Sequence, residues 1–130
     1  MGIMSNHIHL IISVEENRSL SDVIRDFKKF TSVEILKEMA SNSVESRKNW
    51  MLWIFKKAGE GNHRNKDYQF WQQDNHPIEL DHDEIIQSKM DYLHENPVRA
   101  GIVRMEKDYI YSSGIDYYGD EKGLIEIDFL

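Results

Sequence analysis

The chain has 130 residues, of which 40% are hydrophobic and 30% charged, a composition typical of one globular domain of cytoplasmic type. It has no cysteine and no apolar run long enough to cross a bilayer, which excludes disulfides, thiolate metal sites and a membrane span. The net charge of −7 is unfavourable for nucleic-acid binding, but residues 1–80 hold 11 acids and 11 bases, so a DNA-contacting surface there stays open.

The N-terminal region predicts a strand followed by a helix. Residues 6–14 read NHIHLIISV, which is rich in Ile and apolar at alternate positions, as in a half-buried strand. Ser19 occupies an N-cap position, and Asp22 three residues later predicts a capping box. The helix is expected to run towards Met39. Its apolar face comprises Leu20, Val23, Ile24, Phe27 and Phe30.

The middle of the chain predicts a second helix and a loop. The helix is expected over residues 44–57, and residues 59–67 (GEGNHRNKD) read as a polar loop. Trp50 and Trp53 in this helix, and Trp71 beyond the loop, are expected to be core residues rather than base-stacking platforms.

The C-terminal region predicts short strands around a third helix. Residues 68–73 and 78–80 are strand-like pieces around a turn, and residues 124–130 (LIEIDFL) alternate like a last strand. The helix begins at Asp83, with acids in its first turn, and is expected to end at or just before Pro97. Its predicted core row is Ile86, Met90 and Leu93.

His7 and His9 form the first candidate site. Residues two apart in a strand project to the same face, so the two imidazoles could converge on one divalent cation and leave coordination positions open for a substrate. Because the chain has 6 histidines, a chance His-x-His triplet is also a reasonable reading of the pair, and the motif alone is weak.

Tyr92 is the second candidate. Ile85, Lys89, Tyr92 and Asn96 form a row beside the core row, so the phenol can point outward with an amide one turn below it. A phenol is a poor nucleophile unless a nearby cation offsets the charge that it acquires. The alternative reading is a tyrosine at the core margin and an asparagine that merely ends the helix.

Other polar residues carry weaker signals. The cations that could contact phosphates are Arg25, Lys28, Lys29, Lys89, Arg99 and Arg104, although most such side chains are simply solvated. Four further histidines have no partner at ligand spacing and are expected to be structural or exposed: His63, His76, His82 and His94.

Four segments together resemble a known family. MSNHIHLII (residues 4–12) resembles the histidine–hydrophobic–histidine motif of the IS200-like single-tyrosine HUH transposases. FWQQDNHPIEL (70–80), YLHENPVRAGIV (92–103) and YIYSSGIDYYG (109–119) resemble the branch called REP-associated tyrosine transposases. Order and spacing agree over nearly the whole chain, and the combination of His-x-His with Tyr-x-x-x-Asn-Pro makes the resemblance specific.

The resemblance implies a set of roles. His7 and His9 would bind Mg²⁺ or Mn²⁺, with Asn96 as a further polar group near the metal. Tyr92 would attack a phosphate of single-stranded DNA folded into a hairpin, forming a 5′-phosphotyrosine link and releasing a 3′-hydroxyl. Some relatives work as dimers, so the resemblance is compatible with either a monomer or a homodimer.

The implied fold is α+β, an antiparallel sheet packed by helices in a ferredoxin-like arrangement, formed by residues 1–130 as one catalytic domain. Family members usually have a strand and a helix before the histidine pair, whereas His7 here is six residues after Met1, so we expect both to be missing. Two alternatives to an active transposase therefore remain. One is an inactive remnant that binds hairpin DNA, and the other is a fragment with impaired folding.

Overall fold

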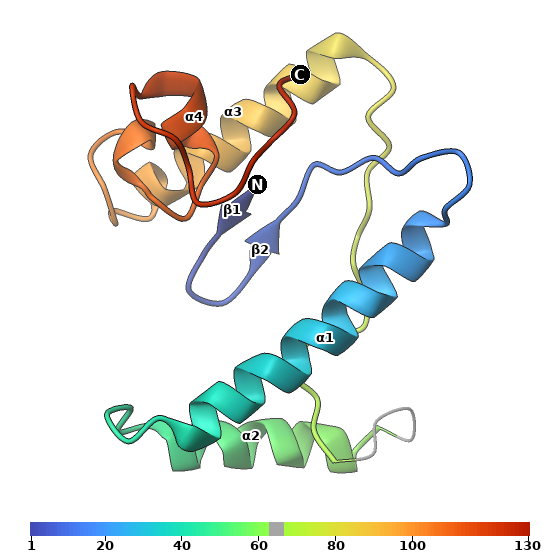
Figure 1. Cartoon of the computed structure of the whole chain (residues 1–130), viewed down its shortest axis with the longest axis vertical. Coiled ribbons are helices and arrows are strands. Elements are labelled where there is room, and N and C mark those ends of the chain that lie inside the picture. Colours follow the sequence, from blue (N-terminus) through green and yellow to red (C-terminus); the bar gives the residue numbers. More distant parts are fainter. Residues whose placement is uncertain (63–66) are drawn as a thin grey trace. The chain divides into compact units, whose positions relative to one another are not determined.

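The computed structural model describes residues 1–62 and 67–130, and contacts between Cα atoms divide the chain into two compact units. Unit 1 comprises Met1–Ile12 and Ile78–Leu130, and unit 2 comprises Ser13–Pro77. Unit 1 holds a two-stranded sheet and the helices α3 and α4, whereas unit 2 holds α1 and α2 (Figure 1). This confirms the predicted α+β class with antiparallel pairing.

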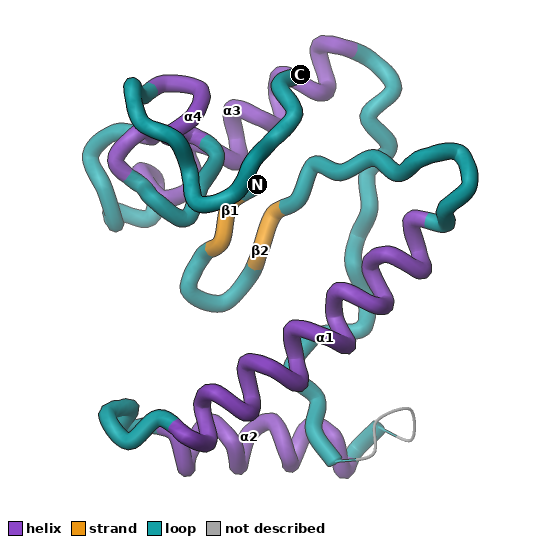
Figure 2. Tube along the Cα trace, in the orientation of Figure 1, coloured by secondary structure: helices purple, strands orange, loops and turns teal. Residues whose placement is uncertain are grey.

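The sheet of unit 1 is a small hairpin. β1 (Gly2–Ile3) pairs antiparallel with β2 (Ile8–His9), Gly2 lies opposite His9, and the His7 carbonyl accepts a 2.8 Å hydrogen bond from the Met4 amide in the connecting turn. The strand predicted over residues 6–14 was wrong in extent, because only the two residues of β2 are paired (Figure 2). A strand extends only as far as its partner, and β1 is two residues long.

Helix α3 (Asp83–Arg99) supplies most of the unit 1 core. Its predicted apolar row is confirmed, since Met90 and Leu93 are buried and Ile86 is half-buried. The sheet approaches this row closely at Gly2, where an added Cβ would lie 3.2 Å from Leu93 Cδ2.

The end of α3 differs from the prediction. Pro97 lies inside the helix and is fully buried, and its ring removes only one amide donor from the helical hydrogen bonds. The helix ends instead at Arg99, and Gly101 two residues beyond it has a φ of 71°, the left-handed conformation that glycine adopts readily. Gly101 N–H donates to the Val98 carbonyl and Ile102 N–H to the Pro97 carbonyl, both at 2.9 Å, as in a Schellman motif.

The C-terminal part of unit 1 folds over α3 without a strand. It contains a 3₁₀ turn, η1 (Glu106–Asp108), and the short helix α4 (Gly114–Tyr118). The strand predicted over residues 124–130 was wrong. The tail is held by Tyr117 instead, whose ring lies 5.0 Å from that of Phe129 and whose hydroxyl accepts a bond from the Leu130 amide.

Unit 2 begins with the long helix α1 (Leu20–Ser41). The predicted start after Ser19 is confirmed, but neither Ser19 nor Asp22 forms the predicted capping box. Asp22 instead pairs with Arg25 one turn later. No residue of α1 is buried, so its apolar face is only partly covered within the described residues.

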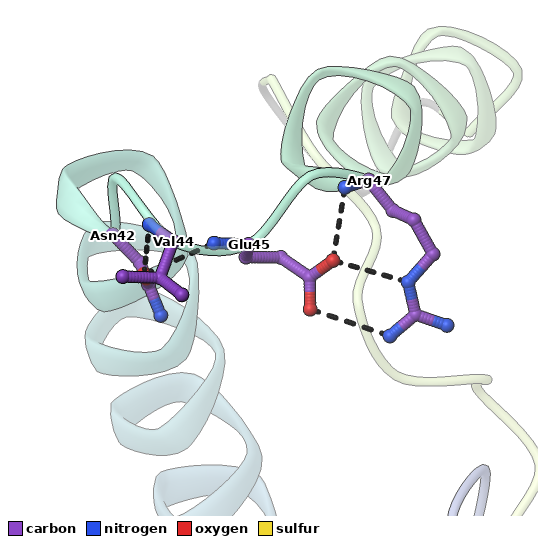
Figure 3. Close-up of polar contacts among 4 residues, drawn as sticks. All are labelled: Asn42, Val44, Glu45 and Arg47. Atoms are coloured by element: carbon purple, nitrogen blue, oxygen red, sulfur yellow. Dashed lines mark hydrogen bonds and ion pairs between the residues drawn. The ribbon is translucent and has the colours of Figure 1, made fainter.

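A polar turn joins α1 to α2 (Lys48–Glu60). The Asn42 side-chain oxygen accepts bonds from the amides of Val44 (2.9 Å) and Glu45 (3.2 Å) (Figure 3). The Glu45 carboxylate in turn binds the amide and guanidinium of Arg47. These local bonds compete with helical ones, so α2 begins four residues later than the predicted Val44 and continues to Glu60.

Residues 67–77, the last described segment of unit 2, return along α1 without regular structure. The predicted strand pieces at 68–73 and 78–80 are not strands. Trp50 and Trp53 are 61% and 57% exposed, so their assignment to the core was wrong, whereas Trp71 is half-buried. The predicted loop 59–67 starts later, since Gly59 and Glu60 belong to α2, and His63 lies outside the described residues.

Candidate active site around His7, His9 and Tyr92

The β1–β2 hairpin brings His7 and His9 together. Their ring centroids are 4.9 Å apart with planes at 77°, although His7 lies just before the paired residues rather than within a long strand. His7 Nδ1 lies 2.7 Å from the side-chain oxygen of Asn6, which accepts a hydrogen bond from it. That bond leaves the Nε2 lone pair of a neutral His7 ring available to a ligand.

Tyr92 of α3 completes the cluster within the same unit. The centroid of its ring lies 5.6 Å from that of His9, with the planes at 82°. The side chain is 46% exposed, so the phenol is accessible to a substrate while its ring lies against that of His9. The three side chains that the sequence singled out separately therefore share one site.

Two buried polar atoms near this cluster have no hydrogen-bond partner among the described residues: His9 Nε2 and Asn96 Nδ2. An unsatisfied buried polar atom costs about 1–3 kcal/mol, so each is suited to a bound ligand. Burial, and secondarily the charge of His7, lowers the pKa of His9. The neutral ring that results keeps the lone pair that metal coordination requires.

The N-terminal part of the chain is similar to a known family. Residues 1–56, which include His7, His9 and all of α1, match the family described as transposase IS200 like. The matched stretch does not include Tyr92. No curated protein and no solved structure matches the chain.

The donor set of this cluster suits a weakly held divalent ion. Residues 1–62 and 67–130 contain no cluster of three or more His, Cys, Asp or Glu side chains able to hold a metal. The two imidazoles could be joined by the amide oxygen of Asn96, since turning the amide would exchange its oxygen and nitrogen. The remaining positions would fall to water or substrate oxygens, as suits an open catalytic site.

Arg99 approaches Tyr92 from about two turns further along α3. Its guanidinium carbon lies 5.6 Å from the centroid of the Tyr92 ring, a cation–π distance. Lys89, one turn before Tyr92, is half-buried on the same helix. Arg99 therefore places a permanent positive charge beside the Tyr92 ring.

The other surroundings of Tyr92 are acidic. Tyr92 lines a shallow depression along α3 together with Asp83, Glu84, Gln87, Ser88, Asp91, Glu95 and Arg99. Four carboxylates and one guanidinium therefore surround the phenol on this face. A DNA phosphate entering here would be repelled by the net negative charge, and a bound metal cation would reduce that repulsion.

The predicted DNA contacts in unit 2 form a separate group. Arg25, Lys28 and Lys29 of α1 line a second depression together with residues 68–73 and Asn75. Their place relative to Tyr92 is not determined, so they are not assigned to the same site.

His94, which was expected to be structural or exposed, is structural. This residue is 1% exposed, and its two ring nitrogens lie 2.9 Å from Ser113 Oγ and 3.4 Å from Tyr118 Oη. Helical spacing could have found it, because His94 follows the buried Met90 by four residues and so belongs to the core face of α3. His76 and His82 are exposed as expected.

None of the helices that the structure describes is long and apolar enough to cross a membrane.

Proposed function

We propose that this chain is a metal-dependent single-tyrosine transposase of the REP-associated branch, which cuts single-stranded DNA hairpins through Tyr92. The observation that carries the proposal is the ring cluster, in which His9 lies 4.9 Å from His7 and 5.6 Å from Tyr92. A single phosphate could contact the phenol and the imidazole-bound ion at once, which is the proximity that phosphoryl transfer requires.

The covalent step follows from the chemistry of a phenol and a phosphodiester. Tyr92 Oη attacks the phosphorus, a bond forms between them, and the bond from phosphorus to the 3′-oxygen breaks. The phenol proton ends on the 3′-oxygen, so the products are a 5′-phosphotyrosine link and a free 3′-hydroxyl. Attack of another 3′-hydroxyl on the link reverses the step and joins new ends without ATP.

The neighbouring side chains have separable roles in this step. Neutral His7 and His9 would hold Mg²⁺ or Mn²⁺, which would polarise the phosphate oxygens and neutralise their charge. Asn96, about one turn beyond Tyr92 on α3, would add an amide whose Nδ2 is buried without a partner among the described residues. Arg99 stabilises negative charge that develops between the phenol and the phosphate.

A covalent-adduct assay tests the proposal. The full chain is incubated with MnCl₂ and a pool of hairpin oligonucleotides labelled at the 3′ end, which is the fragment that stays attached. Denaturing gels then show labelled protein. We expect Tyr92→Phe to abolish the adduct and His7→Ala or His9→Ala to slow it about 100-fold or more. Tyr111→Phe is the matched control, since Tyr111 is 47% exposed in the same unit. An adduct in Tyr92→Phe, or unchanged rates in both histidine variants, would refute the assignment.

The acidic surroundings of Tyr92 favour one alternative, a remnant that binds hairpin DNA without cutting it. Its signature in the same assay is retention of labelled hairpins on native gels together with no covalent adduct from the parent chain in Mg²⁺ or Mn²⁺. Asp91→Asn combined with Glu95→Gln removes two of the four carboxylates. If repulsion alone blocks the reaction, this double variant gains an adduct.

A further inference from the structure

Unit 2 contains a depression whose lining differs in chemistry from the depression at Tyr92. It lies between α1 and the returning segment of residues 68–75 and has a volume of about 560 Å³. The lining residues are Ser21, Ile24, Arg25, Lys28, Lys29, Ser32, Tyr68, Gln69, Phe70, Trp71, Gln72, Gln73 and Asn75. Among the described residues, three cations and no carboxylate therefore line it.

The aromatic side of this depression is held in place by contacts with both helices of unit 2. Trp71 Nε1 donates a 2.9 Å hydrogen bond to Thr31 Oγ1, and the Trp71 ring lies 6.0 Å from that of Phe27. Phe70 lies 5.0 Å from both Trp71 and Phe55 of α2. Tyr68, at one end of the segment, is 41% exposed, so part of its ring is open to stacking.

The cations differ in what they can offer a ligand. Lys28 is half-buried and donates a 2.6 Å bond to the Gln72 carbonyl, which ties the returning segment to α1. Arg25 pairs with Asp22 and Asp26. Lys29 is exposed and has no ion pair within the described part of unit 2. Lys29, which has no such ion pair, and Arg25, which shares its charge with two carboxylates, can together contact about two phosphates. This number is small for a DNA-binding surface.

We infer that this depression binds single-stranded DNA, with Tyr68 stacking on an unpaired base and Lys29 and Arg25 contacting the phosphates on either side. Stacking needs an exposed base face, which a continuous duplex does not offer, and the amides at Gln72 and Asn75 can meet base edges. The inference rests on the proposed function only in taking DNA rather than RNA as the ligand.

The two units differ in net charge, which favours DNA binding by unit 2. Unit 1 carries 13 acids and 5 bases, whereas unit 2 carries 10 acids and 11 bases. A DNA strand is therefore attracted more to unit 2 than to the unit that holds Tyr92. Binding there keeps the strand on the same molecule and raises its effective concentration at the phenol.

Fluorescence anisotropy of the full chain tests the inference, with a labelled unstructured 20-nucleotide DNA strand and the same sequence as a blunt duplex. We expect Tyr68→Ala to weaken single-strand binding about tenfold or more. Lys29→Gln should weaken it several-fold and reduce the slope of log affinity against log salt by about 0.7. The matched controls are Phe30→Ala, an exposed aromatic of α1 outside the depression, and Lys37→Gln on the same helix. Far-UV circular dichroism and thermal melting confirm that each variant folds.

The outcomes separate this inference from the proposed function. Equal affinity for strand and duplex, or parent-like affinity in both Tyr68→Ala and Lys29→Gln, overturns the inference, even if the Tyr92 adduct forms. Loss of binding in those two variants, with the controls unchanged, supports it, even if the parent forms no adduct. If the depression binds single-stranded DNA and Tyr92 is also the nucleophile, saturating DNA restores adduct formation in Lys29→Gln but never in Tyr92→Phe.

Discussion

Tyr92 has an imidazole at its edge and a guanidinium over its face. The rings of His9 and Tyr92 are nearly perpendicular, and the Arg99 guanidinium carbon lies 5.6 Å from the Tyr92 centroid. The phenol is thus held between a neutral base, whose pKa is lowered by burial, and a permanent cation. Four carboxylates share the same face of α3, and the Arg99 cation offsets part of their negative charge beside the phenol.

Replacing Arg99 tests its contribution to catalysis. Arg99→Met keeps an unbranched side chain but removes the cation, and we expect the single-turnover rate of adduct formation to fall about tenfold. Arg99→Lys should retain part of the rate, since the charge remains while the planar group that covers the ring is lost. Arg104→Met, also in unit 1, is the control, and a parent-like rate in Arg99→Met would show that the cation–π contact is only structural.

At the scale of elements, the packing of α3 against residues 112–118 depends on a buried histidine. His94 lies between Ser113 and Tyr118, and its ring also lies 5.0 Å from that of Tyr117. Burial is the main cause that lowers the pKa of His94, followed by the positive N-terminus. Its protonation in the folded state is therefore unfavourable.

This packing predicts a loss of stability in mild acid. The unfolded chain binds a proton at His94 near its ordinary pKa of 6.5, whereas the folded chain binds it only at lower pH. Stability is thus unaffected above pH 6.5 and falls as the pH drops below it, and His9 adds in the same direction. Melting temperatures between pH 7.5 and 5 should show this slope. His94→Gln should flatten it, whereas exposed His82→Gln should not; an unchanged slope in His94→Gln would assign the effect elsewhere.

The helices were more predictable from the sequence than the strands. Helical bonds join residues four apart, so the start of α1 after Ser19 and that of α3 at Asp83 could be placed by local signals. The length of β2 depends on a partner elsewhere in the chain, and no local pattern reveals that β1 has only two residues. The position of Pro97 was wrong for a related reason, because its place inside the helix depends on tertiary packing.

The candidate site was predictable in part. His7, His9 and Tyr92 could be named from their spacing and from the family resemblance, and their rings do lie together. The contact of Arg99 with Tyr92 follows from helical spacing but could not be told from ordinary surface charge. The sequence also could not reveal that residues 68–75 return along α1, because that depends on the hydrogen bonds of Trp71 and Lys28.

For the molecule as a whole, charge and exposed apolar surface act against each other. The net charge is −7 at neutral pH, yet large apolar side chains are exposed on both units, including Phe30 at 69%, Trp50 at 61% and Phe129 at 66%. Mutual repulsion between chains therefore opposes the association that such side chains promote.

We expect solubility to be lowest near pH 5.3, the isoelectric point, where this repulsion vanishes. Light scattering across pH 4.5 to 8 measures it. Trp50→Ser with Trp53→Ser should reduce the scattering maximum without lowering the melting temperature, since both rings are mostly exposed. His94→Gln should leave the position of the maximum unchanged. If the pH of maximum scattering shifts in His94→Gln instead, unfolding rather than loss of charge drives association.

The anchoring of His94 also limits how α3 can turn. Residues two apart on a helix point about 200° away from each other, so Tyr92 and His94 lie on nearly opposite sides of α3. Rotation of the whole helix about its axis would withdraw His94 from Ser113 and leave a buried ring nitrogen without its partner. The position of the Tyr92 backbone is consequently fixed by a contact on the far side of the helix, and its phenol can leave the His9 ring only by rotation of its own side chain.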